Sequence, residues 1–372
     1  MIRRIFHPVG QGAFYSESHE NNINIVYDCG TEYRNKKSKT GVVTQSFRKG
    51  DVIQILFISH FDYDHISLID ILKNKVEIKK VVIPLLHEGE KIALSEIYKD
   101  SGESSLATLV SNPNDFFGEK TRVITVQPYS EDIREDIREP INLDTNETIK
   151  NILSRTPITI NNLSDWIFVP FNYENEERKN EFLNKLSENN IDIEKIKNDP
   201  EYALDKNLRE EIKTIYKHIS GGINQNSMFL YSGPSSTTRR FFREMGKCFH
   251  HFCCVRPYSC CRFFGTDRVA CLYTGDGDLN KVDVKRIYSA YWDFVGTIQI
   301  PHHGSLSSFN KNILYNDGDF LLCPISVGKN NSYGHPSVRV ISEILSHRDS
   351  YPILITEDID STFVEIVEDT NN

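Results

Sequence analysis

One short segment concentrates side chains that can bind a metal ion: His60-Phe61-Asp62-Tyr63-Asp64-His65. Histidine nitrogens and carboxylate oxygens are the ligands that Zn, Mn and Fe ions prefer. The segment directly follows an apolar run, Val52 to Ser59, which predicts a buried strand. A tight loop at a strand end can direct all four side chains into one cavity. The sequence therefore predicts a metal centre at this strand end.

Three later segments add residues of the same chemistry. Asp276 follows the predicted strand Val269 to Tyr273, the pair His302-His303 follows Ile298 to Ile300, and His335 ends a loop. A carboxylate placed like Asp276 can bridge two cations. Two metals roughly 3.5–4 Å apart can share a bridging water, lower its pKa and clamp a phosphate.

The elements that must position these residues resemble those of a layered protein. Near-continuous apolar runs predict strands buried on both faces, typical of an α/β (α+β) fold. Ile23 to Tyr27 is a further such run, and it leads into Asp28. Val338 to Leu345 is predicted to be a helix. Tyr351 to Ile355 and Thr362 to Val367 are predicted to form a closing hairpin.

The domain organisation is interpreted as a single domain, 1–372, that carries two insertions. The first spans about 88–218. Its polar part, about 175–218, has apolar residues at helical spacing and predicts a pair of surface helices broken near Pro200. The second spans about 235–268 and is rich in cysteine and arginine.

Composition excludes several classes of protein. The chain has 372 residues, 39% hydrophobic and 26% charged, the mixture of a soluble globular protein. No apolar run approaches the ~20 residues that span a bilayer. The first residues carry charge with no apolar run behind them, so we expect no signal peptide and a cytoplasmic location. Eight cysteines then favour thiols or metal ligands over disulfides.

The second insertion allows more than one interpretation. Cys253, Cys254, Cys260 and Cys261 lie symmetrically about Pro257, so a structural zinc, reduced thiols and disulfides all remain open. The net charge of −9 argues against binding nucleic acid through the overall field. The stretch 239–268 nevertheless carries seven basic and two acidic residues. Arg239 and Arg240 are therefore candidates for a substrate-facing patch, with a solvated basic hairpin as the alternative.

These segments together resemble a known family. The chain is similar to the metallo-β-lactamase fold, and within it to the ComEC-type competence-nuclease branch without membrane segments. The segments that carry the resemblance are Val9-Gly10-Gln11-Gly12, Asp28-Cys29-Gly30, 59–65, Asn226-Ser227, Thr274-Gly275-Asp276, Pro301-His302-His303-Gly304-Ser305 and 326–336. The resemblance covers about half of the chain. It implies a four-layer αββα sandwich with metals at the edge where strand-end loops meet.

The resemblance also implies roles for individual residues. The metal ligands would be His60, Asp62, Asp64, His65, Asp276 and His302. Between the two neighbouring histidines, His302 is preferred to His303 because it is the first one beyond the strand end, and His303 remains the alternative ligand. Asp64, His303 and His335 would be catalytic, binding the phosphate, orienting water or moving a proton. Ser305, Asn331 and Tyr333 would contact substrate, and Asp28 would fix a ligand.

The sequence departs from the family pattern at two positions. Asp62 stands where the superfamily usually has a second histidine, so manganese is expected beside zinc. Ala13 stands where the branch often has aspartate.

The function expected from these observations is metal-dependent hydrolysis of a phosphodiester, by a nuclease acting on DNA or RNA through a water activated by two metals. The alternative within the enzymes is a metallohydrolase of a small phosphodiester, cyclic nucleotide, lactone or thioester. A third interpretation is a partner-docking module with latent activity, for example in a defence system, with the first insertion as its docking surface.

Overall fold

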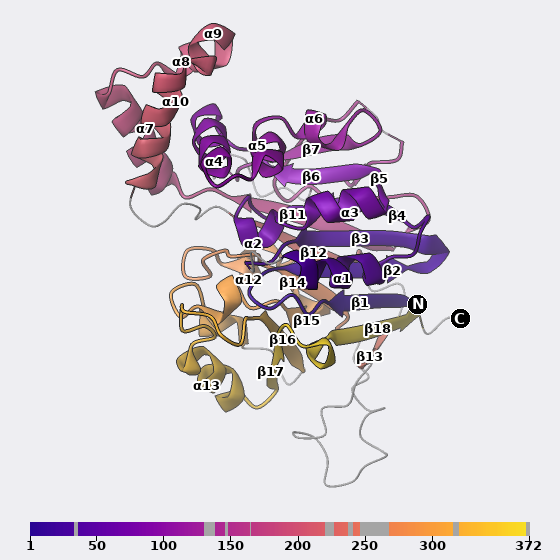
Figure 1. Cartoon of the computed structure of the whole chain (residues 1–372). Helices are drawn as coiled ribbons and strands as arrows, with labels where there is room; N and C mark the ends of the chain where they lie inside the picture. Colours follow the sequence, from indigo (N-terminus) through magenta and orange to yellow (C-terminus); the bar gives the residue numbers. More distant parts are fainter. Residues whose placement is uncertain are drawn as a thin grey trace.

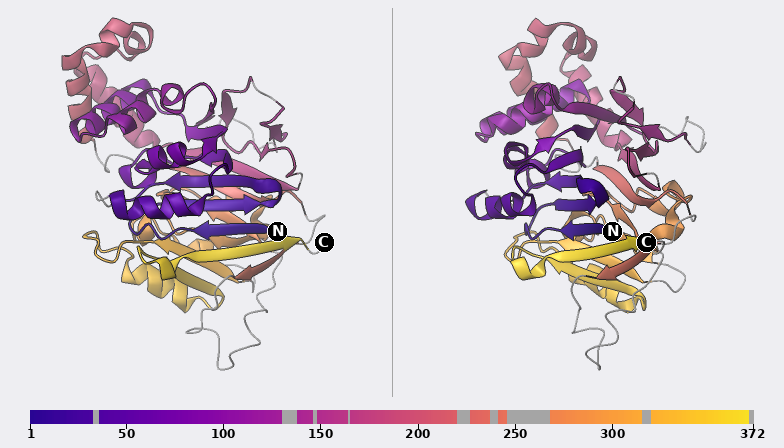
Figure 2. Two further views of the ribbon diagram at one scale, coloured as in Figure 1. Left: turned by 45° about the vertical axis from the view of Figure 1, so that its right-hand side comes forward. Right: turned by 90° about the vertical axis from the view of Figure 1, so that its right-hand side faces the viewer.

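The computed structural model describes residues 1–32, 36–129, 138–145, 148–163, 165–219, 227–236, 241–245, 268–314 and 320–369. Two β-sheets lie face to face, and helices cover the outer face of each sheet (Figures 1 and 2). Buried apolar side chains form three groups: one between the sheets and one under each outer layer of helices. This arrangement confirms the predicted α/β (α+β) four-layer αββα sandwich.

The first sheet has the order β13-β18-β1-β2-β3-β4-β6-β7-β9 over the described residues, with β5 beside β4. Its strands are β1 (Ile2–Phe6), β2 (Phe14–His19), β3 (Ile23–Cys29), β4 (Val52–Phe57), β5 (Glu77–Ile78), β6 (Lys80–Pro84), β7 (Arg122–Gln127), β9 (Asn151–Leu153), β13 (Phe241–Met245) and β18 (Phe363–Asp369). From β3 to β9 neighbouring strands are parallel. Their carboxyl ends therefore meet at one edge.

The second sheet has the order β17-β16-β15-β14-β12-β11-β10-β8. Its strands are β8 (Ile141–Asn142), β10 (Ile158–Thr159), β11 (Trp166–Tyr173), β12 (Ser227–Pro234), β14 (Ala270–Tyr273), β15 (Val295–Ile298), β16 (Leu321–Ser326) and β17 (Ser350–Ile355). The strands from β14 to β17 are parallel. The loops after β14 and β15 meet the loop after β4 at the same edge of the sandwich, where they form the site described below.

Helices cover both outer faces. Those over the first sheet are α1 (Lys36–Ser46), α2 (Tyr63–Ile66), α3 (Ile69–Lys75), α4 (Glu88–Asp100), α5 (Ser104–Ser111) and α6 (Pro113–Phe117). Beyond them project α7 (Glu176–Glu188), α8 (Ile193–Asn198), α9 (Pro200–Leu204) and α10 (Lys206–Lys217) (Figure 1). The second sheet carries α12 (Val284–Ile287) and α13 (Val338–Ser346). No helix within the described residues is long and apolar enough to cross a bilayer.

Two sequence predictions about individual elements are wrong. The expected closing hairpin does not form, because β17 pairs with β16 in the second sheet while β18 pairs with β1 in the first. A short linker lets each strand find a partner in a different sheet. The expected pair of surface helices is four helices, since Asp192, Asp199 and Asp205 each cap a new helix start.

The segments interpreted as insertions also contribute strands to the sheets. Within 88–218, β7 and β9 extend the first sheet, and β11 is a long member of the second. Within 235–268, β13 pairs with β18 at the edge of the first sheet. The helices α4–α6 and α7–α10 are the parts of the first segment that lie outside the sheets.

Candidate metal centre

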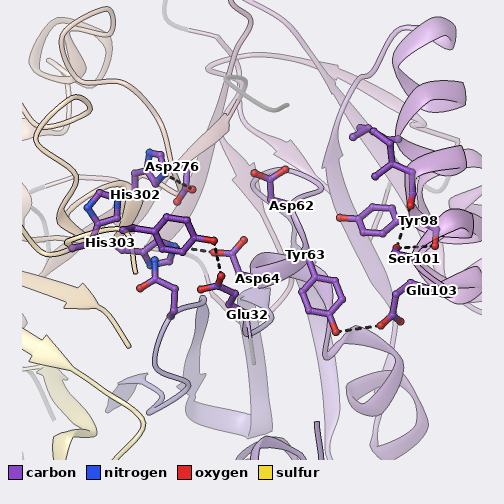
Figure 3. A pocket seen from close by; sticks show the side chains of 15 residues that line it. Glu32, Asp62, Tyr63, Asp64, Tyr98, Ser101, Glu103, Asp276, His302 and His303 are labelled. Atoms are coloured by element: carbon purple, nitrogen blue, oxygen red, sulfur yellow. Dashed lines mark hydrogen bonds and ion pairs between the residues drawn. The ribbon is translucent and has the colours of Figure 1, made fainter. Parts of the chain in front are cut away.

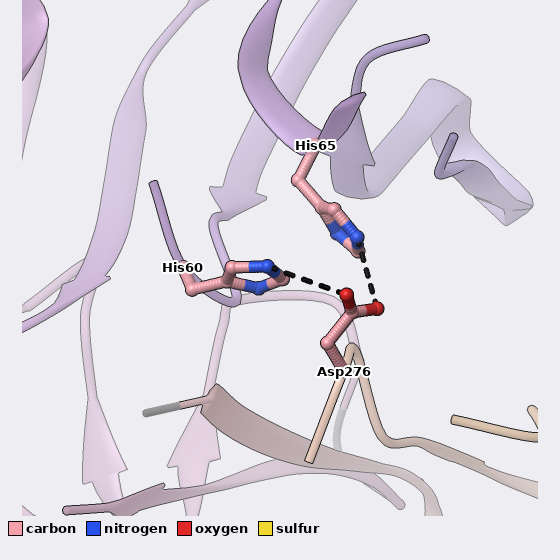
Figure 4. Close-up of side chains that lie close together, drawn as sticks. All are labelled: His60, His65 and Asp276. Atoms are coloured by element: carbon pink, nitrogen blue, oxygen red, sulfur yellow. Dashed lines mark ion pairs between the residues drawn. The ribbon is translucent and has the colours of Figure 1, made fainter. Parts of the chain in front are cut away.

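Three side chains from segments that follow strands of two different sheets converge at the shared edge, where His60 and His65 are buried and the Asp276 side chain is 12% exposed. His60 follows β4, His65 lies on α2, and Asp276 follows β14 (Figure 4). His65 Nε2 is 3.1 Å from Asp276 Oδ1, and His60 Nε2 is 3.8 Å from Asp276 Oδ2. His60 Nε2, His65 Nε2 and Asp276 Oδ1 are buried and have no hydrogen-bond partner among the described residues. Two nitrogens and an oxygen left open toward one point fit a divalent cation.

Asp28 and Ser59 orient both histidine rings. The Asp28 carboxylate accepts hydrogen bonds from the Ser59 backbone N–H at 2.7 Å, from the Ser59 hydroxyl at 2.6 Å and from His65 Nδ1–H at 2.8 Å. Because the Ser59 hydroxyl donates to Asp28, its oxygen accepts from His60 Nδ1–H at 2.8 Å. With both Nδ1 atoms donating, both Nε2 atoms are left to face Asp276. Such partners fix the tautomer of a ligating histidine.

A second group of possible ligands adjoins the first and shares His65. It consists of Asp64, His65 and His303, whose ligand atoms lie within 4.8 Å of one another. His303 Nε2 is 2.9 Å from Asp64 Oδ2, while His303 Nδ1–H donates to the Ser326 carbonyl at 2.9 Å. The two groups together offer donors for two cations, with His65 between them.

Opposite charges dominate the pKa values in this cluster. Burial would lower the pKa of His65, but Asp276, Asp64 and Asp28 raise it well above its ordinary value. Burial would raise the pKa of Asp64, but His65 and His303 bring it down to about 2. Asp276 has its pKa held well below its ordinary range by His65 and His302, against the effect of burial. Both carboxylates are therefore ionised at neutral pH, the state that binds a cation.

Close backbone packing fixes the loop that carries Asp276. Gly275 has φ +55, and a Cβ at this position would lie 2.4 Å from Ser227 Oγ. The Gln299 side chain holds the same turn, because its oxygen accepts from the N–H groups of Thr274 and Gly275 at 2.8 Å each. The residue before Asp276 must therefore be small, which explains the Thr-Gly-Asp order in the sequence.

Other predicted ligands lie at the margin of the two groups. Asp62 Oδ2 is 3.6 Å from His60 Nε2, and its side chain is 33% exposed. His302 Nε2 is 3.9 Å from Asp276 Oδ2, and its side chain is 43% exposed. His335 lines the pocket beside them, with ring centroids 5.5 Å from His302. Burial, with His302 and His303 nearby, lowers the pKa of His335, so this ring is neutral at pH 7.

The residues predicted to contact substrate have different surroundings. Ser305 is buried, and its hydroxyl lies 2.8 Å from that of Ser307. Asn331 closes its own loop, donating to the carbonyls of Gly328 and His335 and accepting from two backbone N–H groups. Tyr333 lines the pocket, where its hydroxyl donates to Glu32 at 2.6 Å. Arg239, Arg240 and the cysteines Cys253, Cys254, Cys260 and Cys261 lie outside the described residues.

The site opens into a pocket of about 550 Å³. Asp62, Asp64, Asp276, His302 and His303 form one side, and residues of α4 form the opposite side (Figure 3). Sequence reasoning did not find this α4 wall, nor the roles of Ser59 and Gln299. Ser59 was visible as a small polar residue ending an apolar strand. The α4 wall left no such signal, because apolar residues on a helix look the same whether they face a core or a pocket.

Comparison with known proteins gave matches among solved structures alone. No family model matches the chain, and no curated protein matches it. One similar structure is the metallo-beta-lactamase fold protein YhfI from Bacillus subtilis, with a TM-score of 0.40, 9% identity, and coverage of 97% of this chain and 98% of that one. Another is a long form RNase Z from yeast, with a TM-score of 0.39, 7% identity, and coverage of 88% of this chain and 37% of that one.

Proposed function

We propose that the protein is a metal-dependent phosphodiester hydrolase, and specifically a nuclease acting on DNA or RNA. The observation that carries this proposal is the convergence of His60 Nε2, His65 Nε2 and Asp276 Oδ1, which are buried and have no hydrogen-bond partner among the residues that the structure describes. An unsatisfied buried polar group costs about 1–3 kcal/mol, so three at one point are costly unless a ligand completes them. The adjoining Asp64 and His303 make the site large enough for two cations.

The donor set suits zinc or manganese, as imidazole and carboxylate together do. Two such cations would neutralise the charge of a phosphodiester and lower the pKa of water at the site. The residues of this chain supply the rest. Asp28 and Ser59 keep the ligand rings oriented. The neutral ring of His335 lines the pocket, where it can accept a proton from water and, once protonated, return it to the leaving oxygen.

A second candidate function has its own support. None of the described residues that line the pocket is lysine or arginine. A groove for a long nucleic acid normally contacts the backbone through such residues. Hydrolysis of a small phosphodiester, through the same cations, is therefore the alternative.

The test measures metal content and cleavage together. Protein loaded separately with Mn²⁺, Zn²⁺ and Mg²⁺ is incubated with labelled single- and double-stranded DNA and RNA. We expect cleavage with at least one metal, and loss of both cleavage and bound metal in His60→Ala and Asp64→Ala. His218→Ala, at the exposed histidine that directly follows α10, is the matched control and should retain both. A fully metal-loaded wild type that cleaves no nucleic acid would contradict the nuclease assignment.

A further inference from the structure

The loop between β1 and β2 brings one glutamine, Gln11, to the lining of the pocket shown in Figure 3. Gln11 is only 4% exposed, and the backbone of its loop is held from two sides. The Gln11 carbonyl accepts from the Glu32 N–H at 2.7 Å, and the Ala13 N–H donates to the Asp64 carbonyl at 3.1 Å. Because Asp64 belongs to the second ligand group, these bonds fix the loop relative to the candidate metal centre.

The Gln11 side chain has a defined orientation of its amide. Its Oε1 accepts from the backbone N–H of Gly328, in the loop after β16, at 3.2 Å. A backbone N–H can only donate, so the amide atom that faces it must be the oxygen, and the NH2 group must face elsewhere. This NH2 group donates to no residue in the described part of the chain. Since Gln11 is buried except toward the pocket that it lines, the acceptor for its NH2 group must be water or a ligand in that pocket.

The other side-chain donors of the pocket lining are mostly engaged within the protein. Each hydroxyl of the lining already donates to an acceptor, and these hydroxyls belong to Tyr63, Tyr98, Ser101 and Tyr333. The described lining contains no lysine or arginine. Apart from its histidines, the described lining therefore offers an anion one uncommitted side-chain donor, the NH2 group of Gln11.

A phosphodiester needs such a donor. Cations at the ligand groups can compensate part of its charge, but negative charge on its non-bridging oxygens is still redistributed as the attacking oxygen approaches phosphorus. A donor that is already fixed in position stabilises that charge without having to reorganise. The amide of Gln11 is fixed through Oε1, and it carries no positive charge that would pair with the carboxylates of the ligand groups.

We propose that Gln11 binds the scissile phosphate, with its NH2 group donating to one of the two non-bridging oxygens. This inference rests on the proposed function and adds a contact that the two ligand groups do not supply. A donor on one side of phosphorus contacts one non-bridging oxygen and not the other. Replacing either oxygen by sulfur should therefore have different consequences at this site.

The first experiment uses methyl 4-nitrophenyl phosphate and the two separated enantiomers of methyl 4-nitrophenyl phosphorothioate with the metal-loaded protein. Sulfur accepts hydrogen bonds weakly, so the enantiomer with sulfur toward Gln11 already lacks the contact. Gln11→Ala should lower kcat/KM at least about 10-fold for the phosphate and for one enantiomer, and less than about 3-fold for the other. Gln45→Ala, at an exposed glutamine of α1 that does not line this pocket, is the matched control and should change none of the three. An equal loss with all three esters, or no loss, would overturn the inference.

A second variant separates phosphate binding from a purely structural role of Gln11. Gln11→Glu keeps the length of the side chain and can still accept from the Gly328 N–H, but it has no NH2 group. We expect its bound metal and its urea midpoint to stay close to wild type. Its kcat/KM for the phosphate should fall at least as much as in Gln11→Ala, because the donor is lost and the new charge repels the phosphate. Wild-type activity in Gln11→Glu, with a loss in Gln11→Ala, would reduce the role of Gln11 to holding Gly328 and would overturn the inference.

A binding measurement distinguishes failure of this inference from failure of the proposed function. Orthophosphate is titrated calorimetrically into metal-loaded wild type, Gln11→Ala and Gln45→Ala. We expect binding at least about 5-fold weaker in Gln11→Ala alone. That result without hydrolysis of any phosphodiester would support the role of Gln11 and contradict the proposed function. Equal affinity for orthophosphate in the three proteins would overturn the role of Gln11, whether or not phosphodiesters are hydrolysed.

Discussion

Two buried charged clusters among the described residues differ in how their polar atoms are satisfied. The first is the candidate metal centre at the sheet edge. The second lies between the sheets around Arg4, which contacts Glu17 through Nε and Glu365 through Nη1, both at 2.8 Å. All three side chains of the second cluster are fully buried or nearly so.

In the cluster around Arg4 every carboxylate oxygen has a donor within the protein. Glu17 accepts from Arg4, Ser232 and Tyr273, and Glu365 accepts from Arg4 and Thr297. At the sheet edge, Asp276 Oδ1 and the two facing Nε2 atoms have none among the described residues. In the cluster around Arg4, Arg4 Nη2 and His19 Nδ1 also have no hydrogen-bond partner among the described residues. Buried carboxylates that are all satisfied within the protein need no ligand, whereas a carboxylate oxygen and imidazole nitrogens that converge without hydrogen bonds are suited to hold one.

The largest expected effect comes from changing one buried carboxylate to an amide in each cluster. Asp276→Asn should lose bound metal and at least about 10³-fold in hydrolysis, because the carboxylate lies within reach of three histidines. Glu365→Gln is the matched variant, and its folded fraction should keep both metal and activity. Metal content by mass spectrometry and hydrolysis of methyl 4-nitrophenyl phosphate measure the difference. If the two variants lost activity equally, the distinction between the clusters would be wrong.

Removing the Arg4 guanidinium from the second cluster should lower the stability of the fold without changing metal binding. Arg4→Met leaves Glu17 and Glu365 buried without their partner, and we expect about 3–5 kcal/mol lower free energy of unfolding in urea. Metal content should not change. Adding Glu17→Gln and Glu365→Gln to Arg4→Met should restore part of the loss, since no unpaired charge then remains. A variant as stable as wild type would contradict the structural role.

A smaller effect is expected from the residue that orients the histidines. Asp28→Asn keeps the shape of the side chain but weakens its hydrogen bonds to Ser59 and His65. We expect metal affinity to fall about 10- to 100-fold, the usual cost of losing such a partner. Competition with a chelator of known affinity measures it. Excess metal should rescue hydrolysis in Asp28→Asn but not in Asp276→Asn; equal rescue of both would show that Asp28 does not act through the ligands.

The smallest expected effect is the acid dependence of stability from Glu17. Burial would raise the pKa of Glu17, but Arg4 and His19 outweigh it and hold the pKa well below its ordinary value. A carboxyl with a lowered pKa in the folded state contributes stability that is complete above its unfolded pKa, about 4.3, and that is lost as pH falls below this. The urea midpoint should therefore drop more steeply between pH 5 and pH 3 in wild type than in Glu17→Gln, with a difference in slope that corresponds to about one proton bound on unfolding. Parallel slopes would mean that Glu17 is not ionised in the folded protein.

The order of residues in the sequence was enough to predict the layered fold and much of the site. Apolar runs that end in His60, Asp276 or His302 can be found without coordinates, because buried parallel strands bring their carboxyl ends to one edge. The pairing of β17 and β18 could not be found in the same way. Both are apolar strands a few residues apart. Whether they pair with each other or join two separate sheets depends on which strands at the sheet edges still lack a neighbour, here β1 and β16.

The sequence by itself determined which side chains can bind a metal ion and which strand ends carry them. Only the tertiary structure decided which donors face one another. His303 meets Asp64, although 239 positions separate them, and Ser59 links His60 to Asp28. The α4 wall opposite the ligands is likewise a product of packing, since Tyr98 reaches Phe61 only when α4 lies against α10 and the first sheet. The physical reason is that local sequence sets which atoms can bind, while contacts between distant segments set the distances at which they do.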